Sequence, residues 1–390
     1  MLRVWGEFGT LLLGTIYNAR MSREKDAVTK FFKDADIEVN GTRPWDIVVH
    51  DDRLYKRLLR AGSVGLGEAY MEKWWDSERV DLLFEKLLRV QKKRVLTLQL
   101  ILLSIKARIF NRQTRFQARQ VVDIHYDLSN ELYMSFLDPY NQYTCGYFEN
   151  TDDLNEAQIQ KLDLICRKLQ LKSTDTVLDI GCGWGGFAKY AAEHYGCKVV
   201  GITISDEQLA YATKYVAGFP VEIRKQDYRD LAGEQFDKIV IVGMIEHVGY
   251  KNYRKIMEIV SSCLKDDGLF LLHTIGGNET YFAAEPWLDK YIFPNGMVPS
   301  IQQLGKSFEK LFVMEDWHNF GPYYYKTLMA WDKNFQKNWP SLKDKFSETF
   351  FRMFRYYFNS CAGMFKSRRT ELWQIVLSKG ADDTIYKSVR

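Results

Sequence analysis

Four glycines lie close together near the middle of the chain, between a predicted strand and a predicted helix. Gly181, Gly183 and Gly186 fit the pattern G-x-G-x-x-G, and Gly185 is a fourth glycine in the same turn. Such a turn needs residues that tolerate positive φ, and it allows a ligand to approach the backbone closely. The pattern alone is compatible with NAD and with an adenosyl ligand.

Polar residues at the ends of neighbouring strands favour S-adenosylmethionine. Asp179 directly precedes the turn, where its carboxylate can contact the ligand's ammonium and would repel a phosphate. Thr203 and Gln208 follow the next strand and can bind ribose hydroxyls. The third strand ends in residues that can hold adenine, namely Gln226, Asp227 and Tyr228. These features favour a methyltransferase over a dehydrogenase.

Structural roles remain open for some of these side chains. Asp179 can instead cap the helix, and Tyr228 can pack in the core. Asp206 or Glu207 lies at a spacing compatible with the acid that binds an NAD ribose, so a dehydrogenase stays as an alternative. Cys182, inside the glycine turn, is interpreted as a small packing residue rather than a nucleophile.

The elements that position these residues follow from the hydrophobic pattern. From about residue 174, apolar runs rich in Val and Ile alternate with helical stretches. Continuous apolar runs are typical of a parallel sheet covered on both faces, so we expect a doubly wound, Rossmann-like α/β domain of the class I methyltransferase kind. The predicted strands are 176–183, 198–205, 221–228, 236–247 and 268–275, with two later candidates at 312–320 and 372–380.

The N-terminal part is predicted to be smaller and mainly helical. Residues 22–37 form a helix with a Ser cap signal, and a strand, a turn at Asn40 and Gly41, a second strand and a helix follow. Residues 62–90, with the paired Trp74 and Trp75, are expected to continue as helix. We place the boundary so that 1–120 is an N-terminal lipid-binding or dimerisation domain and 121–390 is the catalytic domain.

A basic and apolar segment ends the N-terminal part. Residues 86–122 carry ten Lys and Arg and no Asp or Glu, and the apolar run 95–105 lies between the basic clusters. This combination is typical of a helix on an anionic lipid surface, where each cation contributes about 1 kcal/mol. A buried or dimer-forming helix is the alternative. Binding of nucleic acid by this segment is a weaker alternative, because no nucleic-acid motif accompanies the charge.

Composition narrows the class of protein further. The net charge of +4 over 390 residues is too small for a general polyanion binder. The six cysteines form no C-x-x-C, which argues against disulfides and a zinc ribbon and favours the cytosol. We expect neither a signal peptide in residues 1–20, which contain Glu7, nor a membrane-spanning helix. His247 lies beside Glu246 without further ligands at metal-binding spacing, so no metal site is expected.

With these motifs, the chain resembles the bacterial cyclopropane-fatty-acyl-phospholipid synthases and, more distantly, the mycolic acid cyclopropane synthases. The resemblance covers residues from about 35 to 380. The glycine loop is shared with many methyltransferases, whereas several other stretches are much more specific. These are QYTC, MIEHVG, LLHTIG and YIFPNG, and they are accompanied by IHYDLSNELY, QDYRDL, MEDWHNFG, TLMAW and NSCAGMF.

The resemblance implies an enzyme that transfers the methyl group of S-adenosylmethionine to a cis double bond of a phospholipid acyl chain, followed by proton loss and ring closure. It also implies a bound bicarbonate ion as the base. The ion's cradle carries over to Cys145, Glu246, His273, the backbone at Ile275, and Tyr324, with Tyr323 or Tyr325 as alternatives to Tyr324. Cys361 is sometimes regarded as catalytic in the family. We favour a packing role, because methyl transfer to an alkene needs no thiolate.

The cofactor residues carry over in the same way. Tyr143 and Thr144 should close over the cofactor, and Thr144 stands where the family usually has Ser. The full implied set is Tyr143, Thr144, Asp179, Gly181, Cys182, Gly183, Gly185, Gly186, Thr203, Gln208, Gln226, Asp227, Tyr228 and Arg229. His125 and Asp127 are expected to order the segment that leads to the site.

The resemblance further implies a homodimer that is cytoplasmic and peripherally bound to the inner face of the cell membrane. Two other activities remain open. One is methylation of the same double bond to give a methyl-branched chain. The other is lipid binding without catalysis on a degenerate methyltransferase fold.

Overall fold

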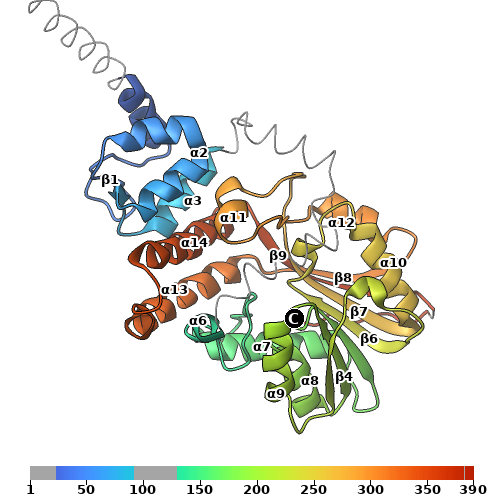
Figure 1. Cartoon of the computed structure of the whole chain (residues 1–390). Coiled ribbons are helices and arrows are strands. Elements are labelled where there is room, and N and C mark those ends of the chain that lie inside the picture. The colour runs from blue at the N-terminus through green and yellow to red at the C-terminus, as the bar shows by residue number, and fades with distance from the viewer. Residues whose placement is uncertain (1–22, 92–129, 382) are drawn as a thin grey trace, which may run out of the picture.

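A seven-stranded sheet is the central element of the computed structural model, which describes residues 23–91, 130–381 and 383–390 (Figure 1). The strand order is β5-β4-β3-β6-β7-β9-β8, and the first five strands in this order are parallel. Their bounds are β3 Thr176–Ile180, β4 Lys198–Thr203, β5 Val221–Lys225, β6 Phe236–Val242 and β7 Leu264–Gly276. The expected α/β methyltransferase fold is therefore confirmed.

Helices cover both faces of this sheet because its strands are apolar on both sides. Val177 of β3 packs with α7 and α8, whereas its neighbour Leu178 packs with α10 and α12 on the opposite face. The bounds are α7 Leu154–Lys168, α8 Gly186–Tyr195, α9 Asp206–Tyr215, α10 Tyr253–Cys263 and α12 Ile301–Phe308. Shorter helices are α6 Asn130–Met134, η1 Tyr228–Asp230, η2 Ile245–His247 and α11 Pro286–Tyr291.

The two late strand candidates are both confirmed, and they add an antiparallel edge to the sheet. They are β8 Val313–Asn319 and β9 Glu371–Ser378. β9 lies between β7 and β8 and is antiparallel to both. Two long helices, α13 Pro322–Leu342 and α14 Glu348–Lys366, separate β8 from β9 in the chain and return it in the opposite direction.

The prediction of one continuous helix over residues 62–90 is wrong. α2 Arg53–Met71 ends before the two tryptophans, β2 Trp75–Asp76 follows, and α3 Val80–Gln91 begins afterwards. Lys73 has a φ of 62°, which ends the helix, and β2 pairs with β1 Val48–Val49. Trp75 is completely buried and donates to the carbonyl of Leu66 at 2.9 Å, so tertiary packing overrides helical propensity here.

The other N-terminal predictions are close to the structure. Residues 23–34 are helical. The first expected strand is reduced to a single bridge between Val39 and Ile47.

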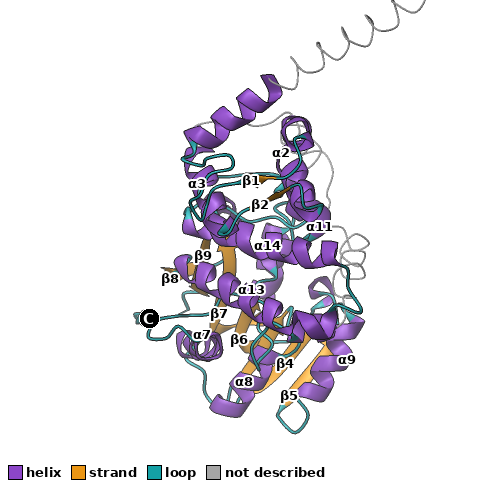
Figure 2. Cartoon of the chain, turned by 90° about the vertical axis from the view of Figure 1, so that its left-hand side faces the viewer, coloured by secondary structure: helices purple, strands orange, loops and turns teal. Residues whose placement is uncertain are grey.

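The N-terminal region shares a hydrophobic core with α13 and α14 rather than having one of its own. α14 lies against α2 and α3, and α13 lies on the far side of α14 (Figure 2). Arg352 of α14 donates to the carbonyl of Tyr70 at 2.6 Å and to the Asp76 carboxylate at 2.7 Å. These contacts hold α2 and β2 against α14.

Several expectations lie outside the described residues. These are the expectation of no signal peptide in residues 1–20, most of the basic segment 86–122, the boundary at 120, and His125 and Asp127. Within the described residues, no helix has the length and apolar character needed to cross a bilayer. The same residues contain no group of three side chains suited to a metal ion. All six cysteines are buried and unbridged.

Candidate active site

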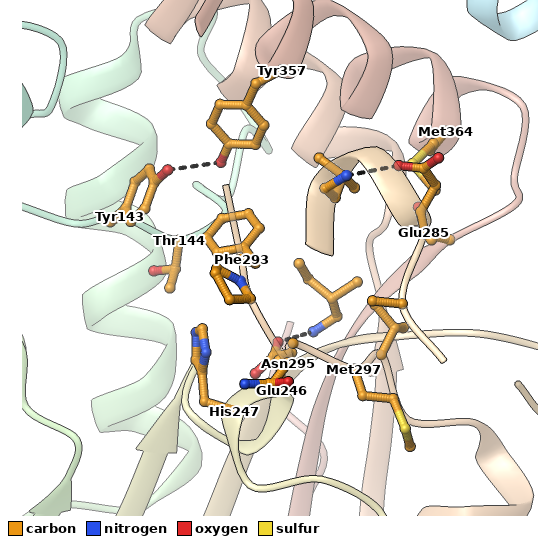
Figure 3. A pocket seen from close by; sticks show the side chains of 18 of the residues that line it. Tyr143, Thr144, Glu246, His247, Glu285, Phe293, Asn295, Met297, Tyr357 and Met364 are labelled. Carbon is orange, nitrogen blue, oxygen red and sulfur yellow. Dashed lines mark hydrogen bonds between the residues drawn. The ribbon is translucent and has the colours of Figure 1, made fainter. Parts of the chain in front are cut away.

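One large cavity of about 1210 Å³ is lined by residues at the carboxyl ends of the parallel strands and by residues of the N-terminal helices. Figure 3 shows part of this cavity. Parallel α/β sheets bind their ligands at this edge. One end is lined by the glycine turn and the polar residues that follow β3, β4 and β5. The other end is apolar and is lined by residues of helix 23–34, α2 and α3, including Phe31, Leu58, Leu66, Phe84 and Leu87.

The glycine turn contributes its first half to the cavity wall. Gly181, Cys182 and Gly183 line the cavity, whereas Gly185 and Gly186 do not. Gly181 has a φ of 80°, which favours glycine there. Gly186 is required for a different reason, because a Cβ at that position would lie 1.8 Å from the carbonyl oxygen of Tyr140. Gly186 thus allows the chain around Tyr140 to pack on the start of α8.

Asp179 lies at the end of β3 and lines the cavity. It is buried, and burial raises the pKa of its carboxyl group to about 7, although the nearby Lys161 ammonium opposes this shift. Its Oδ2 atom has no hydrogen-bond partner among the described residues. A buried acceptor of this kind fits the ammonium group of an amino-acid ligand.

The residues expected to bind ribose and adenine lie together along one wall. Thr203 donates to the side-chain oxygen of Gln208 at 2.9 Å, and both are buried in the wall. The set Gln226, Asp227, Tyr228 and Arg229 also lines the cavity. In contrast, neither Asp206 nor Glu207 does, and Asp206 pairs with Lys225 at 2.6 Å on the surface. The acid position that a dehydrogenase would need is therefore directed away from the site.

Glu246 and His273 lie in the middle of the cavity, at the ends of β6 and β7. Glu246 is buried, and its Oε1 accepts from the backbone N–H of Ile275 at 2.7 Å (Figure 3). Burial raises the pKa of Glu246 to about 7. The same cause holds the pKa of His273 well below its ordinary value, so that its ring is neutral. The Oε2 atom of Glu246 and the Nε2 atom of His273 have no partner in the described part of the chain.

Of the three adjacent tyrosines, only Tyr324 lines the cavity. Its ring stacks on Phe365 at 4.4 Å between centroids. Tyr325 is directed toward α3 and donates to Asp81 at 2.9 Å, and Tyr323 packs against the ring of Tyr147.

The two expected cysteines are placed differently from the other cradle residues. Cys145 is fully buried and donates to the carbonyl of Gly146 at 3.2 Å, and neither Cys145 nor Cys361 lines the cavity. Burial raises the pKa of both thiols, so they are uncharged. The N–H of Ile275 already binds Glu246, which gives Ile275 the role of orienting that carboxyl group.

Tyr143 and Thr144 line the cavity between its polar and apolar parts. The hydroxyl of Tyr143 donates to that of Tyr357 on α14 at 2.9 Å (Figure 3). The hydroxyl of Thr144 accepts from the buried Lys161 at 2.9 Å. The strand-like segment that carries both residues is therefore held from two sides.

Sequence reasoning missed Lys161, Gln374 and the apolar N-terminal wall. Lys161 is completely buried on α7, and Gln374 of β9 contacts the His273 ring. Neither position carries a local signal, because a buried lysine and a cross-strand pair arise only from tertiary packing. The sequence shows the apolar faces of α2 and α3 as helical patterns. It does not show that these faces line the cavity.

The chain is similar to several known proteins in sequence and in structure. The sequence model of the family described as mycolic acid cyclopropane synthetase matches residues 113–375. The cyclopropane-fatty-acyl-phospholipid synthase of Escherichia coli strain K12 is 50% identical over 355 residues, which cover 90% of this chain and 92% of that protein. Cyclopropane mycolic acid synthase 1 of Mycobacterium tuberculosis is 34% identical over 277 residues, covering 66% of this chain and 96% of that protein.

Solved structures show the same relationship. The cyclopropane synthase MmaA2 of Mycobacterium tuberculosis matches with a TM-score of 0.63 and 30% identity, over 69% of this chain and all of that chain. The mycolic acid cyclopropane synthase CmaA1 in complex with SAH and CTAB matches with a TM-score of 0.62 and 31% identity, over 68% of this chain and 99% of that chain.

Proposed function

The chain belongs to the mycolic acid cyclopropane synthetase family, and we propose that it is an S-adenosylmethionine-dependent cyclopropane-fatty-acyl-phospholipid synthase. It transfers a methylene group to a cis double bond of a phospholipid acyl chain. The observation that carries this proposal is the single cavity. It joins the polar residues around Asp179 to an apolar space formed by the N-terminal helices, with Glu246 and His273 between them.

Asp179, Thr203, Gln208 and the residues 226–229 would hold S-adenosylmethionine in the polar end. When bound there, this molecule supplies an electrophilic methyl group. The orphaned Oδ2 of Asp179 supports the fit, because it offers a buried acceptor for the ligand's ammonium. The apolar end, lined by Leu58, Leu66 and Phe84, excludes water from an acyl chain whose double bond is a weak nucleophile.

Aromatic rings stabilise the positive charge that develops on the acyl chain when the methyl carbon forms its bond to one alkene carbon and its bond to sulfur breaks. Tyr143, Phe293, Tyr324 and Tyr357 all line the cavity. A ring face contributes about 0.5 to 2 kcal/mol to a nearby cation and does not capture it as water would. Loss of a proton from the transferred carbon then closes the three-membered ring.

We propose bicarbonate as the base that accepts this proton. Two unpartnered atoms support the fit of a small oxyanion that carries one O–H group. The Nε2 atom of neutral His273 and the Tyr324 hydroxyl can donate to it, and the Oε2 atom of Glu246 can accept from its O–H. Cys145 does not line the cavity, so it lies outside this proposed cradle.

Mass spectrometry tests the reaction. Unsaturated phospholipid vesicles, S-adenosylmethionine and bicarbonate are incubated with the purified protein. We expect the lipid to gain the mass of one CH₂ group and to lose its ozone-sensitive double bond. A gain of CH₂ with two further hydrogens would indicate methyl branching, and no gain despite cofactor binding would indicate a non-catalytic lipid-binding protein.

The role of bicarbonate has a separate test. Turnover is measured in bicarbonate-depleted buffer with bicarbonate added back, for the wild type and for Glu246→Gln. The wild type should depend on added bicarbonate, whereas Glu246→Gln should turn over at least about 100-fold more slowly and still bind S-adenosylhomocysteine. Wild-type turnover that is independent of bicarbonate would exclude it as the base.

We further propose that the segment 86–122 places the enzyme on the cytoplasmic face of the membrane, and that the chain forms a homodimer. The basic composition of the segment supports the first statement. Charge reversal at Lys92, Lys93 and Arg94 should weaken sedimentation with anionic vesicles. Unchanged sedimentation would instead favour a dimer contact, which the mass of the particle in solution would show.

A further inference from the structure

Lys161 is a buried cation beneath the cofactor end of the cavity. It lies on α7, its side chain is completely inaccessible to solvent, and it does not line the cavity. No carboxylate among the described residues forms a salt bridge with it, in contrast to the equally buried Lys168 on the same helix, whose Nζ lies 3.3 Å from Asp316. Burying an ammonium group without an ion-pair partner is costly, so its position calls for an explanation.

The hydrogen bonds of Lys161 all go to one short segment of chain. Its Nζ donates to the side-chain oxygen of Gln142 at 2.5 Å and to the hydroxyl of Thr144 at 2.9 Å. Both acceptors line the cavity. Tyr143, between them, contributes its ring to the same wall.

The beginning of this segment is fixed as well. The Asp138 carboxylate accepts from the backbone N–H groups of Tyr140 and Gln142, each at 2.8 Å. The side-chain amide of Gln142 also donates to the carbonyl of Tyr140 at 2.9 Å, beside the start of α8 at Gly186. Removal of Lys161 would leave the Gln142 and Thr144 acceptors buried without a donor at the point where the segment meets the cavity.

The charge of Lys161 reaches both polar parts of the cavity. Burial raises the pKa of the Asp179 carboxyl group. The charge of Lys161 opposes this rise and so favours the ionised form that an ammonium ligand needs. It also lowers the pKa of His273 and thereby helps to keep that ring neutral. Burial lowers the pKa of Lys161 to about 8, and the nearby Asp138 and Asp179 carboxylates oppose this shift.

We propose that Lys161 is a positioning residue for cofactor binding, which fixes the segment 142–144 over the adenosyl site through its bonds to Gln142 and Thr144. The proposal rests on the proposed function, because it assumes that the polar end of the cavity holds S-adenosylmethionine. Lys161 does not line the cavity, so it would act on the ligand only through Gln142 and Thr144, which do.

The test compares Lys161→Met with Lys168→Met in the full-length protein. Dissociation constants for S-adenosylhomocysteine and S-adenosylmethionine are measured by titration calorimetry. Lys161→Met should weaken both ligands by the same factor, at least about tenfold, because the segment is misplaced for both. Lys168→Met removes an equally buried ammonium from the same helix, next to Asp316 and His318, and should leave both constants unchanged.

Kinetics and a double-mutant cycle separate positioning from general damage. Lys161→Met should raise the KM for S-adenosylmethionine and leave kcat at saturation within about threefold of the wild type. Thr144→Val should add little to Lys161→Met, since both remove the same hydrogen bond. If Lys161→Met does not fold, Lys161→Gln can replace it, because glutamine is shorter and retains a hydrogen-bond donor. This variant should also raise the KM for S-adenosylmethionine and leave kcat nearly unchanged, but the rise in KM should be smaller.

Three outcomes would overturn the proposal. They are unchanged ligand affinity in Lys161→Met, an equal loss in Lys168→Met, and a change confined to S-adenosylmethionine, because a misplaced segment should weaken the binding of both ligands. Failure of the proposed function can be distinguished from failure of this proposal. The role of Lys161 is tested by S-adenosylhomocysteine binding without lipid. If the proposed function is wrong, the wild type will bind the cofactor and form no cyclopropane.

Discussion

The side-chain nitrogen of Gln374 lies 3.3 Å from Nδ1 of His273, and the two residues are paired across strands β9 and β7. With the amide in this orientation its NH₂ group donates to Nδ1, and the neutral tautomer that fits carries its proton on Nε2. That atom is buried in the cavity wall without a partner in the described part of the chain. The antiparallel edge of the sheet thus prepares a hydrogen-bond donor inside the site.

Gln374→Leu should therefore reduce turnover by at least about tenfold, because the ring loses the partner that fixes its tautomer. The KM for bicarbonate should rise, and the affinity for S-adenosylhomocysteine should not change. Steady-state kinetics and calorimetry measure the two quantities, with melting temperature as the control for folding. An unchanged KM for bicarbonate would contradict this role of Gln374.

The affinity for S-adenosylhomocysteine should fall as the pH is lowered through about 7. Burial raises the pKa of Asp179 to about 7, so the carboxylate is charged above this pH and neutral below it, and only the charged form attracts the ligand's ammonium. One proton taken up per site corresponds to about a tenfold loss of affinity per pH unit below the pKa.

Two variants assign this pH dependence. Asp179→Asn should bind S-adenosylhomocysteine weakly, and its affinity should not change between about pH 6 and 8, the range in which the wild-type carboxyl group titrates. Glu246→Gln should keep the wild-type profile, although burial raises the pKa of Glu246 to about 7 as well. A pH dependence that survives in Asp179→Asn would show that another group is responsible.

Leu58→Trp should raise the KM for phospholipid at least about tenfold, since it fills part of the apolar end of the cavity. Binding of S-adenosylhomocysteine should be unaffected, because the adenosyl residues lie at the other end. Val48→Trp adds the same bulk at a residue that is 39% exposed and does not line the cavity, and it should behave as the wild type. Equal lipid kinetics in the two variants would place the acyl chain elsewhere.

Cys361→Ala should retain turnover within about threefold of the wild type, because a small buried residue is replaced by another of similar size. The thiol does not line the cavity, and burial raises its pKa so that no thiolate forms. The measurement is turnover on vesicles, with thermal unfolding alongside. A loss of about 100-fold or more without a change in melting temperature would assign a chemical role to this cysteine.

The sequence was sufficient to predict elements and site residues where a local hydrophobic pattern is followed by residues with a clear chemical role. The strand that ends at Asp179, the glycine turn and α8 follow from continuous hydrophobicity and from residues that tolerate positive φ. Glu246 and His273 were expected at the ends of neighbouring strands, and parallel pairing of β6 with β7 brings them to one edge.

Long-range packing decides the features that the sequence did not reveal. Trp75 forms β2 because Val49 and the carbonyl of Leu66 offer it partners that a local pattern does not contain. Gly186 is explained only by the carbonyl of Tyr140, which lies 46 positions earlier in the chain. The pair of Gln374 with His273 depends on the register of an antiparallel strand that returns after two long helices.

The apolar end of the cavity has a consequence for how lipid selection evolves. The family's common region begins at residue 113, whereas the wall formed by helix 23–34, α2 and α3 precedes it in the chain. Under the proposed function, one part of the wall that would face the acyl chain is therefore encoded outside the region that the family model matches. We expect substitutions in this preceding region to change lipid preference in relatives that keep the same residues around Glu246 and His273.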